Sequence, residues 1–199
     1  ASEHKRRANP QRESFTHKLA ALKSFLPTFL FLILLMTAFM SFSHGTQDVY
    51  PTFLEVQMKL SPQLVGTIGV IYGFAQIAGG FVFGTLSERW GRKRAIIAAA
   101  LLSLLAIPAW AYGHTALTLT IGAVVMQFMV QGAWGVVPAY LAELTPAPVR
   151  ATAPGLAYQL GGLVTSWNAK AQALAAEKWG SYNHVLAISV IIVALSLAL

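Results

Sequence analysis

The sequence contains no cysteine, which excludes disulfide bonds, thiolate metal sites and cysteine nucleophiles. Charged residues make up only 11% of its 199 residues, whereas a soluble domain carries roughly a quarter. Acidic residues are rarer than basic ones, with 7 Asp and Glu against 14 Lys and Arg. Hydrophobic residues reach 56%, so the balance indicates an integral membrane protein. A membrane enzyme is disfavoured because neither G-x-S-x-G nor a metal-ligand spacing occurs.

The sequence contains long runs of apolar residues. The run 25–40 has no charged residue and approaches the ~20 residues that a bilayer-spanning helix needs. We predict an all-α integral membrane fold of six transmembrane helices, over about residues 22–54, 64–87, 94–113, 116–143, 152–175 and 183–199. The first residue is Ala1 rather than Met, and residues 184–199 would rise only ~24 Å as a helix. We therefore expect a piece of a larger transporter, with its last helix truncated.

The basic residues lie between the apolar runs. They concentrate before the first span and in the connections that follow the second and fourth spans. This distribution fits the positive-inside rule better than a nucleic-acid patch, so we expect no nucleic-acid partner. Both termini should be cytoplasmic, with residues 1–21 as a cytoplasmic linker and residues 22–199 as the transmembrane bundle. The polar N-terminal segment lacks the apolar core of a signal peptide.

Glycines are spaced for close helix contact in the second span. Gly69 and Gly73, and likewise Gly80 and Gly84, are four residues apart, which lets helix backbones approach each other. This pattern has two interpretations of about equal weight, namely static packing and bending during transport.

Two ionisable residues follow the uncharged run of the first span. His44 and Asp48 are four residues apart, so they share one helix face, beside Ser41, Gln47 and Thr52. Ionisable groups at membrane depth are costly and by default mark an ion or substrate path. The plainer interpretation is a polar helix end wetted at the outer interface.

The segment 84–94 reads Gly-Thr-Leu-Ser-Glu-Arg-Trp-Gly-Arg-Lys-Arg. Its shortness makes the second and third spans antiparallel neighbours, and Gly91 can adopt the positive φ of a tight turn. The segment resembles the signature loop G-x-L-x-[DE]-R-x-G-R-[KR]-[KR] of the major facilitator superfamily at every specified position. The resemblance implies a conformational latch that closes the inward side and includes Gly84, Glu88, Arg89, Gly91 and Arg92.

A second segment, residues 138–150, places Glu143 at the end of the fourth span and Arg150 before the fifth, with prolines between them that stop the helix. It resembles the P-x-Y-x-x-E-x-x-P-x-x-x-R segment of sugar-porter-like members of the superfamily. The resemblance implies that Glu143 and Arg150 belong to the same cytoplasmic charge network. An ordinary interfacial Glu and Arg is the alternative.

The segment around His44 resembles the pattern N-x-x-[ST]-H-x-[ST]-Q-D-x-x-x-T of Jen-type lactate permeases in the sialate:proton symporter family. Its matching residues are Ser43, His44, Thr46, Gln47, Asp48 and Thr52, while Met40 replaces the family's Asn. Residues 157–161 also resemble that family's Y-Q-L-G segment, which assigns Gln159 to the substrate path, although Gly162 stands where Asn often follows.

The resemblance implies the C-terminal bundle of a twelve-helix carrier, built from two inverted three-helix repeats that divide near His114. The implied function is proton-coupled symport of a short monocarboxylate such as lactate or pyruvate, in a plasma (inner) membrane. Asp48 and His44 would couple the proton, a protonated His44 could face the carboxylate, and Gln47, Thr52 and Gln159 would supply hydrogen bonds. The expected partners are a small organic anion, protons, the lipid bilayer and an absent N-terminal six-helix half. No cofactor or metal is expected.

Three alternatives remain open. The substrate could be another organic acid, such as sialate or an aromatic acid, or a sugar. A non-transporting membrane scaffold or sensor could use the same half-fold. Gln127 and Gln131 are four residues apart within the fourth span and could bond a neighbouring helix or face the cavity, and Asn168 is equally ambiguous.

Overall fold

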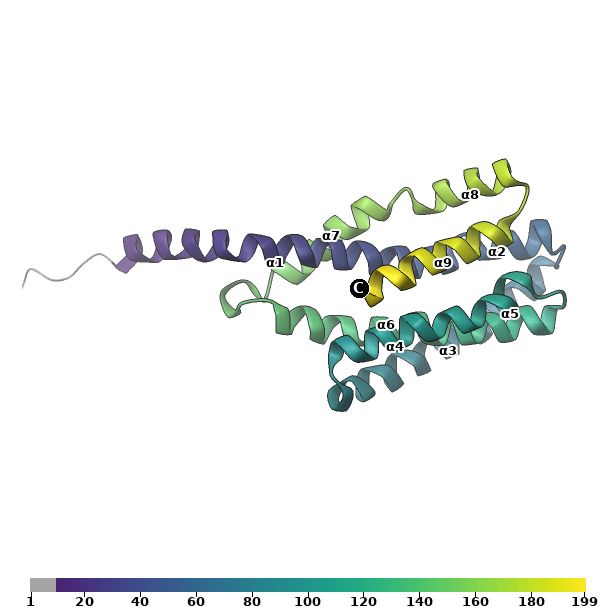
Figure 1. The fold of residues 1–199 in the computed structure, drawn as a ribbon, viewed down its shortest axis with the longest axis horizontal. Helices are drawn as coiled ribbons and strands as arrows, with labels where there is room; N and C mark the ends of the chain where they lie inside the picture. The colour runs from purple at the N-terminus through teal and green to yellow at the C-terminus, as the bar shows by residue number, and fades with distance from the viewer. Residues whose placement is uncertain (1–9) are drawn as a thin grey trace, which may run out of the picture.

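The computed structural model describes residues 10–199, with side chains from residue 25 onward, and the regular elements of that part are all helical. They lie along the long axis of the molecule, and their connections alternate between its two ends (Figure 1). In order they are α1 (Pro10–Gln47), α2 (Tyr50–Thr52), the π-helical turn η1 (Phe53–Gln57), α3 (Pro62–Trp90), α4 (Arg92–Ser103), the 3₁₀ turn η2 (Leu104–Ala106), α5 (Ile107–Tyr112), α6 (Ala116–Leu144), the 3₁₀ turn η3 (Ala147–Val149), α7 (Ala153–Thr165), α8 (Asn168–Trp179) and α9 (Tyr182–Ala198).

The prediction of an all-α membrane fold is confirmed. In the described part, four helical segments are long and apolar enough to cross a bilayer, namely Phe25–Gln57, Pro62–Trp90, Arg92–Tyr112 and Ala116–Leu144. The apolar helix α9 is shorter, with 17 residues. The count of six spanning helices therefore stays a prediction.

The first helix begins earlier than predicted. We expected it near residue 22, but α1 starts at Pro10. Residues 11–26 contain neither glycine nor proline, so nothing in the backbone chemistry stops a helix before the apolar run. The second half of the predicted linker 1–21 is thus helical, while residues 1–9 lie outside the described residues.

The fifth predicted span is not one helix. The structure divides the range 152–175 between α7 and α8, which meet at a turn at Ser166 and Trp167. Hydroxyl groups bond back to the chain just before this turn, with Thr165 Oγ1 donating to the Gly161 carbonyl at 2.9 Å and Ser166 Oγ donating to the Leu163 carbonyl at 2.8 Å. Such bonds compete with the helical ladder and bend helices.

Other helix ends follow from local sequence. Ser61 precedes α3 and its Oγ accepts the Leu64 N–H at 3.3 Å, the usual role of a serine at that position. Thr115 and Thr118 form a reciprocal cap at the start of α6. Gly91 joins α3 to α4 at φ 91° and ψ 146°, which confirms the predicted positive φ.

Helices α3 and α6 touch backbone to backbone. A Cβ at Gly79 would overlap the carbonyl oxygen of Phe128, and a Cβ at Gly135 would overlap the backbone of Gly80. Of the two predicted glycine pairs, only Gly80 and Gly84 lie near α6, whereas a Cβ at Gly73 would meet nothing within 4 Å. Glycine thus sets the α3–α6 distance along the second half of α3.

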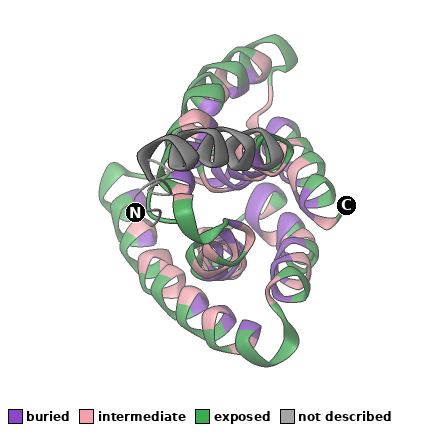
Figure 2. Ribbon diagram, turned by 90° about the vertical axis from the view of Figure 1, so that its left-hand side faces the viewer, coloured by how far each residue is buried: buried purple, intermediate pink, exposed green. Residues whose placement is uncertain are grey.

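Buried and exposed positions alternate along the helices (Figure 2). Tyr50 and Trp110 are among the largest buried side chains and stack with their ring centroids 5.2 Å apart. The Tyr50 hydroxyl group donates to the backbone carbonyl of Trp110 at 3.2 Å. This contact ties α2 to the last turn of α5.

We predict that Gly79→Ala destabilises the protein, because its new methyl group must displace the Phe128 carbonyl and overpacking costs about 1–3 kcal/mol. Gly73→Ala on the same helix is the matched control, since it adds a methyl group in open space. Thermal unfolding in detergent measures both. Equal melting temperatures for the two variants would contradict the close contact.

We also predict that Gly91→Val lowers the melting temperature. Residue 91 lies at φ 91° and ψ 146°, a region that side chains with a Cβ avoid at a cost of about 1–3 kcal/mol. The control is Gly66→Val, because Gly66 has no positive φ and nothing lies within 4 Å of its Cβ position. A Gly91 variant as stable as that control would show that the turn readily adopts another conformation.

Candidate functional site

The backbone of the first span is interrupted beside the predicted proton path. The ladder of α1 ends with the Asp48 N–H bonded to the His44 carbonyl at 3.0 Å, and it resumes with the Phe53 N–H bonded to the Val49 carbonyl at 2.9 Å. Asp48 and Val49 form a bend outside any helix. Pro51 contributes to the break because it has no N–H to give to the Gln47 carbonyl, four residues earlier.

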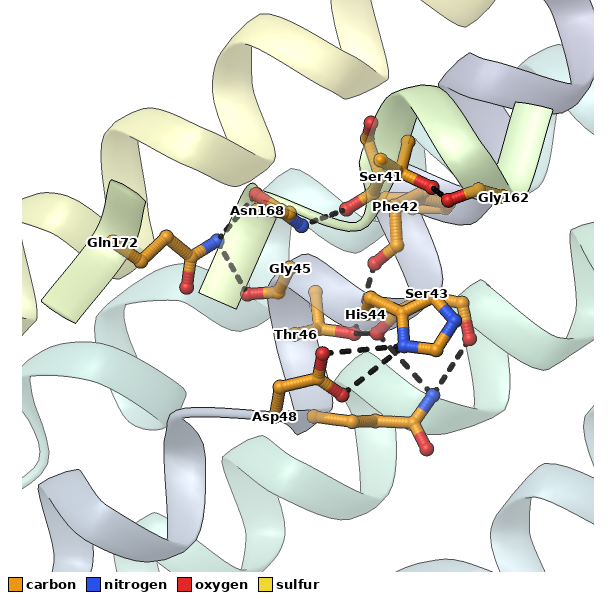
Figure 3. A network of polar contacts seen from close by, with 12 residues as sticks. Ser41, Phe42, Ser43, His44, Gly45, Thr46, Asp48, Gly162, Asn168 and Gln172 are labelled. Atoms are coloured by element: carbon orange, nitrogen blue, oxygen red, sulfur yellow. Dashed lines mark hydrogen bonds and ion pairs between the residues drawn. The ribbon is translucent and has the colours of Figure 1, made fainter. Parts of the chain in front are cut away.

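His44 and Asp48 lie at this break and contact each other, as predicted from their spacing. His44 Nδ1 is 3.2 Å from both carboxylate oxygens of Asp48, and the side chains are 51% and 36% exposed. Figure 3 shows a ring nitrogen of His44 directed at the carboxylate group of Asp48. A proton on either group changes the charge of the pair, and a protonated imidazole offers N–H groups to an anion.

A network of side-chain amides lies next to the pair and joins α1, α3 and α6. Gln76 Nε2 donates to Gln47 Oε1 at 3.1 Å and to Gln127 Oε1 at 3.0 Å. Gln47 Nε2 and Gln131 Nε2 both donate to Ser43 Oγ, at 2.8 and 3.2 Å. The network thus brings together three helices at the level of the break.

Gln127 also bonds Thr46 across the contact between α6 and α1. Its Nε2 donates to Thr46 Oγ1 at 3.1 Å and to the Thr46 carbonyl at 3.3 Å, and both residues are 1% exposed. The question that the sequence left open is therefore answered for this structure, in which Gln127 and Gln131 bond a neighbouring helix. Thr46 lies within the packed interface rather than on an open surface.

A second pair of amides reaches α1 from α8. Gln172 Nε2 donates to the Gly45 carbonyl at 3.2 Å, and Asn168 Nδ2 donates to the Ser41 carbonyl at 3.5 Å. Figure 3 places these two side chains on the other side of α1 from the His44 ring. Asn168, ambiguous in the sequence, is thus a contact between helices.

Two of the predicted path residues have no side-chain partner in the described part of the chain. Thr52 lies in α2 and Gln159 in α7; both are exposed, and neither side chain forms a hydrogen bond with the described residues. Their predicted roles in the substrate path therefore stay predictions.

The loop between α3 and α4 is joined to the end of α6. Arg92 Nε donates to Glu143 Oε1 at 3.0 Å, and Arg92 Nη1 donates to the buried Ser87 Oγ at 2.6 Å. Ser87 Oγ in turn donates to the Gly84 carbonyl at 2.6 Å. One arginine thus links the two sequence motifs that were predicted to share a charge network.

The other predicted latch residues are not part of this link. Glu88 and Arg89 are exposed and form no ion pair with the described residues. Arg150 Nε donates to the Thr145 carbonyl at 3.1 Å, so it closes the turn after α6 instead of pairing with Glu143.

Sequence reasoning missed Gln76, Ser87 and Gln172. Gln76 lies in the middle of an apolar helix, and a polar side chain at that depth is itself a signal of an interhelical bond. Nothing in the local sequence of Ser87 or Gln172 indicates their partners. Among the described residues, no group of three or more His, Asp or Glu side chains could hold a metal ion.

Comparisons with known proteins agree with the motifs. Residues 24–199 match the family model described as Major Facilitator Superfamily. The chain is 32% identical over 160 residues to a "Carboxylic acid transporter protein homolog" of Saccharomyces cerevisiae, across 78% of this chain and 26% of that protein. It is 36% identical over 120 residues to the "MFS-type transporter criB" of Aspergillus cristatus, across 58% of this chain and 25% of that protein.

A bacterial relative is the "D-xylose transporter" of Levilactobacillus brevis, which is 28% identical over 104 residues, across 52% of this chain and 23% of that protein. The matches thus span about a quarter of the length of these curated relatives. Because the family model covers residues 24–199, and four helical segments of the described part are long and apolar enough for a membrane, the chain belongs to the Major Facilitator Superfamily.

Proposed function

We propose that this chain is the C-terminal six-helix half of a twelve-helix carrier that moves a short monocarboxylate, such as lactate or pyruvate, together with protons. The observation that carries the proposal is the His44–Asp48 pair, exposed beside a break in an apolar helix. Relatedness to a carboxylic acid transporter homolog supports the substrate class. The resemblance to Jen-type permeases rests on the residues around this pair.

In the proposed carrier, residues 1–21 link the two halves and both termini lie on the cytoplasmic side. The basic residues of the α3–α4 and α6–α7 connections support this orientation through the positive-inside rule. Both connections lie at the same end of the molecule in Figure 1. The substrate path then lies between the halves, with the membrane being the plasma (inner) membrane.

The chemistry of the pair suits coupled binding of an anion and a proton. A protonated His44 pairs with the substrate carboxylate, and Asp48 accepts the proton that accompanies it. Charge-assisted hydrogen bonds of this kind are roughly twice as strong as neutral ones. Gln47, Thr52 and Gln159 complete the proposed path as neutral hydrogen-bonding groups, with Ser43 and Thr46 supporting them.

A sugar is the second candidate substrate. The relative named as a D-xylose transporter favours it, and so do the amides of Gln47, Gln76 and Gln131, since amide groups both donate to and accept from hydroxyl groups. A scaffold or sensor would transport neither substrate. Uptake of labelled lactate and labelled xylose by the full-length carrier in proteoliposomes distinguishes the three.

We predict saturable lactate uptake driven by an inward proton gradient, and a roughly tenfold or larger increase in KM for lactate in His44→Ala, because the variant loses a charge-assisted hydrogen bond to the carboxylate. His114→Ala, at an exposed position between α5 and α6, is the control. Saturable xylose uptake with no lactate uptake would assign the chain to the sugar candidate.

We predict that Asp48→Asn abolishes uphill uptake but preserves much of the counterflow of labelled substrate. Asparagine keeps the shape of the side chain but cannot exchange a proton. The two rates are measured between about pH 5 and pH 8, where histidine usually titrates, with the exposed Glu55→Gln as control. Normal uphill uptake in Asp48→Asn would mean that the proton is coupled elsewhere.

We predict that Arg92→Ala slows transport several-fold with little change in equilibrium substrate binding, because the Arg92–Glu143 pair joins two helix ends away from the His44–Asp48 pair. The exchange Arg92→Glu with Glu143→Arg should restore part of the rate, and Arg94→Ala is the exposed control. The pair is partly exposed, so we expect a stability change below about 1 kcal/mol. Loss of binding together with transport would contradict a latch.

A further inference from the structure

The bend in α1 leaves backbone carbonyls without their helical donors. In a regular helix these three carbonyls, of Gly45, Thr46 and Gln47, accept from the N–H groups four residues later. Those backbone bonds are missing here, because the chain bends at Asp48 and Val49 and Pro51 has no N–H. In an apolar surrounding an unbonded carbonyl is costly. Donors from other helices that bond these oxygens therefore stabilise the break.

Two glutamine side chains supply such donors from two different helices. Gln172 Nε2 of α8 donates to the Gly45 carbonyl at 3.2 Å, and Gln127 Nε2 of α6 donates to the Thr46 carbonyl at 3.3 Å. These side chains are 4% and 1% exposed. The two amides thus bond neighbouring carbonyls in the last turn of α1, those of Gly45 and Thr46.

The burial of Gln172 indicates what its amide group is for. Its Oε1 is buried and has no hydrogen-bond partner among the described residues, while its Nε2 donates to the Gly45 carbonyl and to Asn168 Oδ1, the latter at 3.4 Å. Burying an unmatched acceptor is unfavourable. What this side chain provides is therefore its donor group.

We propose that Gln127 and Gln172 are positioning residues that clamp the broken end of α1 from two sides and thereby fix the geometry of His44 and Asp48. This inference rests on the proposed function of that pair. Asp48 is the first residue beyond α1, and its N–H bonds the His44 carbonyl. The direction of the Asp48 side chain therefore depends on the hydrogen bonds that the preceding carbonyls accept.

Gly45 is the residue that lets the α8 side of the clamp approach. A Cβ at position 45 would lie 3.2 Å from Gln172 Nε2 and 3.4 Å from Asn168 Nδ2. The first distance is tighter than ordinary van der Waals contact, so alanine must push the Gln172 amide away. Gly45→Ala thus weakens the clamp without removing any hydrogen-bonding group.

The first test is amide hydrogen exchange of the full-length carrier, followed by mass spectrometry of the peptides that cover residues 44–53. Gln127→Met and Gln172→Met keep the side-chain length but lose the donor. We expect exchange in this segment to rise about fivefold, as for the loss of one buried hydrogen bond. Gln63→Met is the control, since Gln63 is exposed and its amide group bonds none of the described residues. Wild-type exchange in both clamp variants would overturn the proposal.

The second test separates positioning from simple folding support. In folded, membrane-inserted carrier we expect the clamp variants to raise KM for lactate several-fold, in the direction of His44→Ala. A purely structural role would lower the maximal rate through loss of folded carrier and leave KM unchanged. Faster exchange with wild-type KM would overturn the positioning role.

Gly45→Ala keeps the proposal testable if a glutamine variant fails to fold. We expect a smaller rise in exchange over residues 44–53 and a smaller rise in KM, while Gly66→Ala, which adds a methyl group in open space, changes neither. Wild-type exchange and KM in Gly45→Ala would count against the α8 side of the clamp. If His44→Ala and Asp48→Asn leave transport unchanged, the proposed function fails, whereas the exchange experiment still decides whether the clamp exists.

Discussion

Lipid cannot hydrogen-bond a backbone, so a carbonyl at membrane depth needs a donor from the protein or from a water-filled cavity. In α1 the bend at Asp48 and Val49 and the missing N–H of Pro51 interrupt the ladder at the level of the His44–Asp48 pair. Helices α6 and α8 lie beside α1 and carry the amides of Gln127 and Gln172, which bond two of the freed carbonyls.

Glycine lets the backbones of neighbouring helices approach each other closely. The α6 backbone lies against α3 where Gly135 faces Gly80 and where Gly79 faces the Phe128 carbonyl, and α7 lies against α1 where Gly161 faces the backbone of Met36. Side-chain hydrogen bonds between helices have short reach, so a larger residue at these contacts would separate the helices beyond it. The close contact of α3 with α6 is accompanied by the hydrogen bond from Gln76 Nε2 to Gln127 Oε1 at 3.0 Å.

The sequence predicts the local structure but only some of the contacts between residues far apart in the chain. The helical class, the positive φ of Gly91 and the His44–Asp48 contact follow from hydropathy, turn chemistry and helical periodicity. The break between α7 and α8 was not predicted, because the back-bonding of Thr165 and Ser166 competes only weakly with a helix. The Gln172–Gly45 contact spans 127 residues, and no periodicity within one helix determines which helix lies beside it.

Helix α6 connects the two polar regions of the structure. Gln127 and Glu143 lie on this one helix, sixteen residues apart in the numbering, which corresponds to ~24 Å along the axis. Pro138 lies between them and removes a backbone bond at Trp134, where a helix bends most readily. The Trp134 ring packs against Phe39 and Tyr158, with centroids 5.8 and 6.2 Å away. Pro138 therefore separates the part of α6 that bonds α1 through Gln127 from the part that bonds Arg92 through Glu143.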